Sequence, residues 1–185
     1  MQTEWSVRAI SRSMVPILLA LTLVEIGSGL VLGRFEGALL RSPSLLVLVP
    51  VTIGTAGNLG SVLAARLSTA FHLGTLAFAP TDDQLAGNAL ATVALSLTVF
   101  PAIGVGAWLL AEVTVGARLG LGTVVAVALA SGAALAVLAV VVTLVATYAA
   151  YRFELDPDDV VIPVVTNVCD VLGVLVLFAS VALLV

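Results

Sequence analysis

Five long apolar segments dominate this chain of 185 residues and limit what it can fold into. Each is continuous for 20 residues or more, about the length that an α-helix needs to cross the hydrocarbon core of a bilayer. None alternates polar and apolar residues as membrane β-barrel strands do. The sequence therefore predicts an all-α membrane protein with five transmembrane helices. We expect these helices over residues 14–33, 44–68, 85–111, 121–151 and 159–185.

Composition supports this fold class. Hydrophobic residues make up 61% of the chain and charged residues 10%, whereas a soluble domain has about 45–50% and about 25%. These values exclude an ordinary soluble domain and leave no length for a sizeable one beside the membrane part. We expect a short N-terminal segment over residues 1–13 and a single five-helix transmembrane domain over residues 14–185.

The number and positions of the charged residues limit the possible binding partners and the orientation of the chain in the membrane. The chain has seven arginines, eleven acidic residues and a net charge of −4, so no basic patch could bind nucleic acid. The expected partner is the lipid bilayer of a cell membrane, crossed several times. Five spans place the two termini on opposite sides, and the arginine count favours a cytoplasmic N-terminus by four to three. That side holds Arg8, Arg12, Arg66 and Arg152, and the other holds Arg34, Arg41 and Arg118.

Asp170 is the one acidic residue deep in the last apolar segment. Thr166 and Asn167 lie one helical turn before it and form a polar stripe with it. Pro163 has no N–H, so it leaves the carbonyl oxygen of Asp159 free near the start of this helix. A carboxylate, a hydroxyl, an amide and a carbonyl are oxygen ligands, which suit hard cations such as Mg²⁺. The alternative is a structural Asp170 that is protonated or paired with an arginine of another helix.

Small residues recur every four positions in the second apolar segment, at Gly57, Ser61 and Ala65. This spacing lets two helix backbones approach closely. Simple helix packing would explain it, but the glycines could also bring Asn58 and polar backbone to the wall of an ion path.

Other acidic groups give two further hypotheses. Glu25 lies inside the first apolar segment, where it could bind a cation, pair with an arginine or serve as a protonated packing group. An acidic loop before the last segment could concentrate cations at the mouth of a path, or it could be a solvated turn that starts a helix. Its acidic residues are Glu154, Asp156, Asp158 and Asp159. No enzyme signature is present, so we expect no catalytic residues.

Two stretches resemble the MgtE-type magnesium transporters. Residues 50–74, with Gly57-Asn58-Leu59-Gly60-Ser61 and Arg66-Leu67-Ser68-Thr69, are similar to the second transmembrane helix of that family. Residues 155–173, with Val164-Val165-Thr166-Asn167-Val168-Cys169-Asp170, are similar to the fifth. The form Asp-Asp-Val-Val-Ile-Pro at residues 158–163 is also similar to the eukaryotic solute-carrier magnesium transporters and their half-length prokaryotic relatives.

The resemblance implies a homodimer with a cation path between the subunits. Asp170 would be the central cation site, and Thr166 and Ile162 would face the path through backbone oxygens. Gly57, Asn58 and Gly60 would form part of its wall, and Asp156 and Asp159 would lie at its cytoplasmic mouth. The N-terminal regulatory domains of bacterial members are not expected here, so gating would be internal, absent or supplied by a separate regulatory chain.

Coordination chemistry agrees with a dimer. Mg²⁺ demands octahedral oxygen geometry and keeps several waters, so one aspartate from one subunit makes a poor cage. Two Asp170 carboxylates across a two-fold axis could hold a hydrated ion through its water shell. Mn²⁺, Co²⁺ or Ca²⁺ could take the place of Mg²⁺. Two alternatives remain: an exchanger that couples the divalent cation to Na⁺ or H⁺ through Glu25, and a membrane subunit that binds a regulatory partner without transporting ions.

Overall fold

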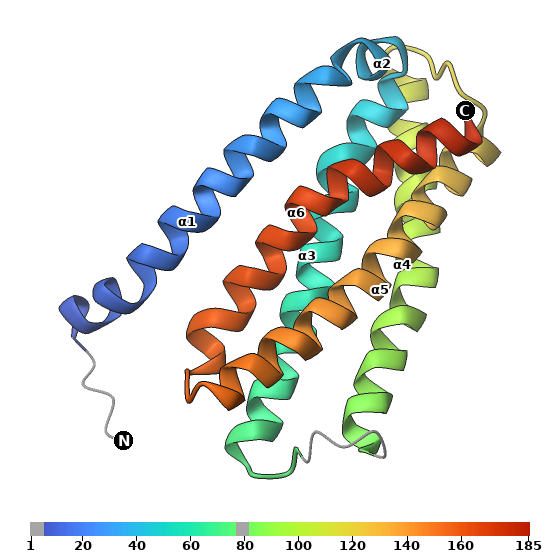
Figure 1. The fold of residues 1–185 in the computed structure, drawn as a ribbon. Coiled ribbons are helices and arrows are strands. Elements are labelled where there is room, and N and C mark those ends of the chain that lie inside the picture. Colours follow the sequence, from blue (N-terminus) through green and yellow to red (C-terminus); the bar gives the residue numbers. More distant parts are fainter. Residues whose placement is uncertain (1–5, 77–81) are drawn as a thin grey trace.

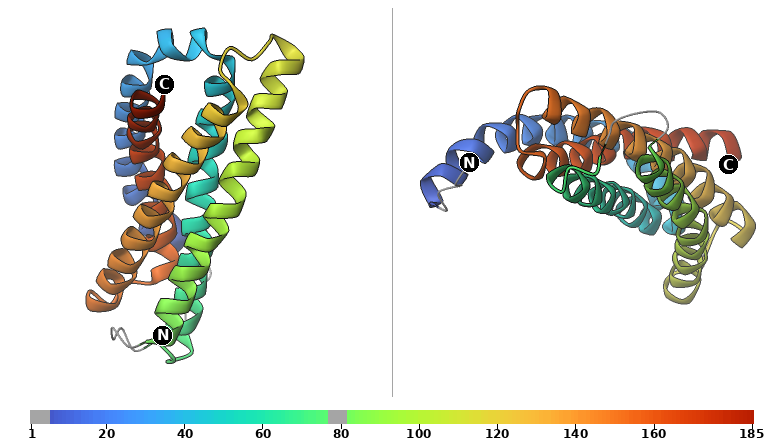
Figure 2. Two further views of the ribbon diagram at one scale, coloured as in Figure 1. Left: turned by 90° about the vertical axis from the view of Figure 1, so that its right-hand side faces the viewer. Right: turned by 90° about the horizontal axis from the view of Figure 1, so that it is seen from below.

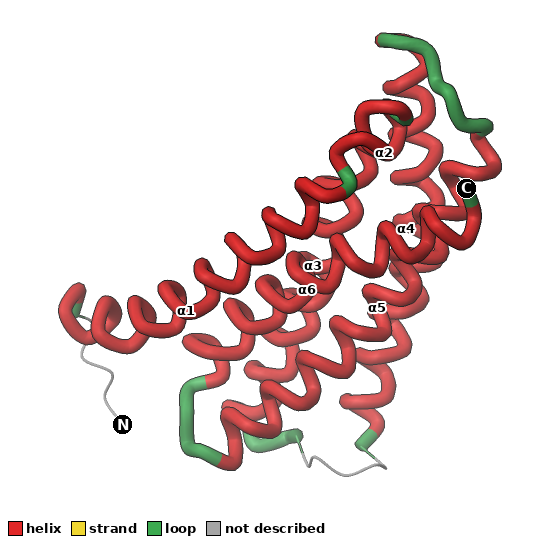
Figure 3. Tube along the Cα trace, turned by 45° about the horizontal axis from the view of Figure 1, so that its top comes forward, coloured by secondary structure: helices red, strands yellow, loops and turns green. Residues whose placement is uncertain are grey.

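The computed structural model describes residues 6–76 and 82–185, and folds them into one short and five long helices. The five long helices are long and apolar enough to cross a membrane, which confirms the predicted fold class. They lie side by side, and the connections between them gather at the two ends of the bundle (Figures 1 and 3). The helices are α1 (Val7–Arg34), α2 (Glu36–Arg41), α3 (Pro43–His72), α4 (Asp83–Thr114), α5 (Leu121–Arg152) and α6 (Pro157–Leu184).

The observed helices differ from the predicted ones mainly around α1. This helix begins at Val7 rather than Met14, and the charged segment after it contains the short helix α2 instead of only a loop. Glu36 lies in the first turn of α2 and Arg41 in its last turn, where their charges complement the helix dipole. The Nε of Arg41 also donates to the carbonyl oxygen of Gly37 at 2.9 Å.

Aspartates define the starts of two long helices. Asp82 Oδ1 accepts hydrogen bonds from the backbone N–H groups of Gln84 and Leu85 at the start of α4. Asp156 Oδ1 accepts one from the N–H of Asp158 at the start of α6, and Pro157 occupies the first helical position. Both arrangements satisfy N–H groups that have no partner inside a helix.

The helix α6 lies between α1 and α3 (Figure 1). The contacts of α1 are with α6 and α2, and within the described residues it does not touch α3. Figure 2 shows α1 and α4 at opposite edges of the bundle. The start of α1 and the loop between α5 and α6 lie at one end of the bundle, and the C-terminus lies at the other (Figure 1).

The pair α4 and α5 forms the most closely packed apolar part of the core. A Cβ built on Gly132 would lie 2.0 Å from Phe100 Cγ, and one built on Gly104 would lie 2.8 Å from Val125 Cα. Phe100 itself is completely buried. Since lipid supplies no hydrophobic drive for helix association, close backbone approach at small residues is what holds such helices together.

Candidate cation site

Asp170 lies at the midpoint of α6. It is residue 14 of the 28 in this helix, which places it about 20 Å from either end at a rise of 1.5 Å per residue. Its side chain is half-buried, and among the described residues it has no ion pair or hydrogen bond. An unpaired carboxylate at this depth is costly, so Asp170 is the main candidate for a cation site.

A line of half-buried residues leads from the start of α6 to Asp170. Asp159, Ile162, Thr166 and Asp170 are three to four residues apart and therefore share one face. The hydroxyl of Thr166 donates to the carbonyl oxygens of Ile162 and Pro163, at 3.1 Å each. Inside the helix, Ile162 O also accepts the backbone N–H of Thr166, so the two donors of Thr166 use both of its lone pairs.

The contacts between α3 and α6 show which part of α3 lies opposite Asp170. A Cβ on Gly60 would lie 2.3 Å from Val165 Cγ1, and one on Gly173 would lie 2.8 Å from Ile53 Cγ1. A Cβ on Gly57 would make an ordinary contact at 3.8 Å from Thr166 Cα. The two helices are antiparallel (Figure 1), so Asp170 lies level with the part of α3 between Ile53 and Gly57.

The exposed face of α3 beside this contact carries small and polar residues. Gly54, Asn58 and Ala65 are exposed there, and a Cβ on Gly54 would meet nothing within 4 Å among the described atoms. The hydroxyl of Ser61 donates to the carbonyl oxygen of Gly57 at 2.9 Å. Gly57 and Gly60 pack against α6, which agrees with the helix-packing interpretation. Asn58 is exposed on α3, and its place in the wall of an ion path stays a prediction. The sequence analysis missed Gly54, although its position four residues before Asn58 was a usable signal.

The acidic loop divides into residues with different positions. The carboxylate of Asp156 caps α6, so one of its oxygens is already in use, and the interpretation as a helix start is confirmed. Asp159 is half-buried on the same face as Thr166, whereas Glu154 and Asp158 are exposed. Of the acidic residues in this loop, Asp159 is placed best to pass a cation toward Asp170.

Glu25 and Asn167 lie on the other side of Asp170, at the contact between α1 and α6. Glu25 is exposed near the middle of the apolar span of α1, Met14–Arg34. It lies near enough to Asp170 for the two carboxylates to interact electrostatically. Asn167 is only 9% exposed, and its Oδ1 has no hydrogen-bond partner in the described part of the chain.

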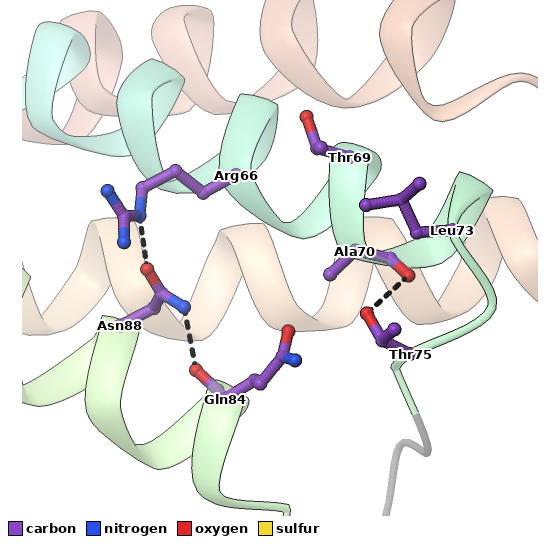
Figure 4. A pocket seen from close by; sticks show the side chains of 7 residues that line it. All are labelled: Arg66, Thr69, Ala70, Leu73, Thr75, Gln84 and Asn88. Atoms are coloured by element: carbon purple, nitrogen blue, oxygen red, sulfur yellow. Dashed lines mark hydrogen bonds between the residues drawn. The ribbon is translucent and has the colours of Figure 1, made fainter.

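A pocket of about 370 Å³ lies at the far end of α3, away from Asp170 (Figure 4). Its polar lining consists of side chains that can donate hydrogen bonds. Arg66 Nε donates to Asn88 Oδ1, and Asn88 Nδ2 donates to the carbonyl oxygen of Gln84 at 2.8 Å. The positively charged guanidinium of Arg66 repels cations, so this pocket is a poor candidate for the cation site.

A single subunit does not supply a complete set of protein ligands for a cation at Asp170. Within the described residues, no three His, Cys, Asp or Glu side chains gather closely enough to hold a metal ion. A complete coordination shell for an ion therefore requires groups from outside the chain, such as water or a second subunit.

Five membrane-spanning helices with a carboxylate at mid-depth define a multi-pass membrane protein of the transporter class. The family model of the MgtE divalent cation transporters matches residues 49–180, so the chain belongs to that family. The match includes both resembling helices and Asp170, but not α1 and Glu25. It is a transporter family and not an enzyme family, so the chain's function is divalent cation transport. A search of curated proteins finds no match.

Proposed function

We propose that this protein transports Mg²⁺ through a path between the two subunits of a homodimer. The path is lined by α3 and α6 of each subunit, and a hydrated ion is held between the two Asp170 carboxylates. One observation carries the proposal: Asp170 is an unpaired carboxylate at mid-membrane, half-buried beside a glycine-rich helix face. A second copy of that face would supply the missing half of the coordination shell.

Selectivity follows from the water shell. Mg²⁺ loses water reluctantly, so a site that contacts the hydrated ion favours it over ions that must be stripped. The hydroxyl oxygen of Thr166 and the amide oxygen of Asn58 can accept hydrogen bonds from that shell. Asp159 attracts cations to the entrance, and the field of the two Asp170 residues draws them in.

The N-terminus is cytoplasmic in this proposal. The ends of the helices at the N-terminal side carry Arg8, Arg12, Arg66 and Arg152, and arginines accumulate on the cytoplasmic side of short loops. Cations then enter or leave the cell through the mouth marked by Asp159. Any regulation by a separate chain acts at this end.

The test is Mg²⁺ uptake into proteoliposomes under an imposed membrane potential. Wild-type protein should take up Mg²⁺ without a gradient of Na⁺ or H⁺. Asp170→Ala should show the background of empty liposomes, and Asp170→Asn should reduce uptake by about tenfold or more. Glu36→Gln removes an exposed carboxylate at the start of α2 and serves as the control with unchanged uptake. Near-normal uptake by both Asp170 variants would refute the site.

A further inference from the structure

The contact between α1 and α6 gathers oxygen atoms at the depth of Asp170. Phe35, just after α1, stacks on Phe178 of α6 with ring centroids 3.9 Å apart. The two helices run in the same direction (Figure 1), so stepping ten residues back from each ring pairs Glu25 with Val168. Glu25 therefore lies at the level of Asn167 and Asp170, in agreement with the electrostatic interaction between the two carboxylates.

Asn167 points to a ligand at this position. It lies eleven residues before Phe178, three helical turns along α6, and so shares the face that packs toward α1. It is nine-tenths buried, and its Oδ1 accepts no hydrogen bond from any described residue. A buried acceptor oxygen without a hydrogen-bond donor indicates a bound cation or a bound water molecule. Ser28, half-buried one turn after Glu25, adds a hydroxyl oxygen on the same side of α1.

Charge neutrality indicates what kind of cation belongs there. This step rests on the proposed function. When both are ionised, two carboxylates per subunit place four negative charges at this depth in the dimer, and no described arginine or histidine pairs with any of them. One Mg²⁺ on the two-fold axis balances two of these charges, which leaves one for each subunit. Symmetry requires the two subunits to be neutralised identically, so each needs one monovalent cation.

We propose that Glu25, Asn167 and Asp170 of each subunit form a second site, away from the two-fold axis, that binds one Na⁺. The ligands come from a single subunit and include a buried amide oxygen, so an ion must shed water to enter. Na⁺ does this more readily than Mg²⁺, which keeps its waters. Because Asp170 belongs to both sites, Na⁺ and Mg²⁺ weaken each other's binding, and this effect is reciprocal.

Thermal unfolding of the purified protein tests this proposal. At constant ionic strength, replacing choline by saturating Na⁺ should raise the Tm of the wild type by about 5 °C. Glu25→Gln should lose the Na⁺ shift and keep the Mg²⁺ shift. Glu25→Asp retains the carboxylate and should keep the Na⁺ shift at higher Na⁺ concentration. Glu36→Gln is the matched control and should keep both shifts, whereas Asp170→Asn should lose both.

The outcomes separate this inference from the proposed function. A Mg²⁺ shift without a specific Na⁺ shift in the wild type would overturn the inference alone. So would a Na⁺ shift that persists in Glu25→Gln, because another site would then bind the ion. If neither ion shifts the Tm of the wild type, the proposed function fails together with the inference. The preserved Mg²⁺ shift in Glu25→Gln also shows that this variant is folded.

Discussion

Two helix pairs in this protein, α4–α5 and α3–α6, both pack closely at glycines but differ in the polar side chains beside the contact. The pair α4 and α5 approaches closely at Gly104 and Gly132, and the pair α3 and α6 does so at Gly60 and Gly173. Around Gly132 the contact is with the ring of Phe100. Around the α3–α6 contact lie the exposed Asn58 of α3 and the half-buried Thr166 and Asp170 of α6. Close packing alone therefore does not mark a functional site; polar groups next to it do.

The pairs also differ in what their polar side chains contact. In α5, the hydroxyls of Ser131 and Thr147 donate to carbonyl oxygens one turn earlier in the same helix, at 2.7 Å each. In α6, Asn167 Oδ1 has no partner and Asp170 no ion pair among the described residues. Satisfied hydroxyls cost little in a membrane, whereas unsatisfied amides and carboxylates indicate a ligand. This difference supports the proposal that α3 and α6 line the ion path and that α4 and α5 form the scaffold.

The largest effect on folding is expected in the scaffold. Gly132→Ala places a Cβ 2.0 Å from the Phe100 ring, and such overpacking costs about 1–3 kcal/mol. Its Tm should fall, while Mg²⁺ uptake per folded molecule stays at the wild-type level. Gly106→Ala, also in α4–α5 but with nothing within 4 Å of the new Cβ, should leave the Tm unchanged. A loss of uptake per folded Gly132→Ala molecule would place α5 in the path and break the comparison.

Gly60→Ala should lower both stability and transport. The new Cβ would lie 2.3 Å from Val165 Cγ1, so α6 must shift or Val165 must change rotamer, at a cost of about 1–2 kcal/mol. A shift of α6 moves Asp170 and should reduce Mg²⁺ uptake per folded molecule. The double variant Gly60→Ala with Val165→Ala removes the clashing methyl groups and should recover most of both losses. Failure of this rescue would show that the contact with Val165 is not the cause.

The fold was largely predictable from the sequence, because helix length and continuous hydrophobicity determine membrane spans directly. The five spans, the helix start at Asp156 and the packing of Gly57 against α6 follow from local pattern. The tighter contact at Gly60 was not part of the predicted four-residue spacing, in which Ala65 proves to be exposed. The short helix α2 did not, since six residues give too little periodicity. The contact of α1 with α6 and the level of Glu25 beside Asn167 depend on tertiary packing, which no local pattern encodes.

Asn58→Ala should reduce transport without affecting folding. The Asn58 side chain is exposed on α3, so its removal should change the unfolding free energy by less than about 0.5 kcal/mol. Loss of an amide that contacts the water shell of the ion should reduce Mg²⁺ uptake by about threefold. Thr98→Ala changes an exposed polar residue of α4 and is the scaffold control. Equal uptake by both variants would remove Asn58 from the path wall.

The smallest effect is expected at the entrance. Asp159→Asn should lower Mg²⁺ uptake by about twofold at low ionic strength and not at high ionic strength, because salt screens exposed charges. Asp158→Asn removes the same charge from the exposed side of the same turn and should have the weaker effect. If the two variants behave alike, the loop acts through its total charge, and Asp159 has no special place in the path.

The measurement that tests the central claim most directly is Mg²⁺ uptake by mixed dimers. Wild-type and Asp170→Ala subunits carrying different affinity tags can be expressed together, and the mixed species purified over both tags and reconstituted. A single shared site needs both carboxylates, so the mixed dimer should transport as little Mg²⁺ as the dimer with two altered subunits. Uptake at half the wild-type rate would instead show that each subunit carries its own path, and would contradict the shared site.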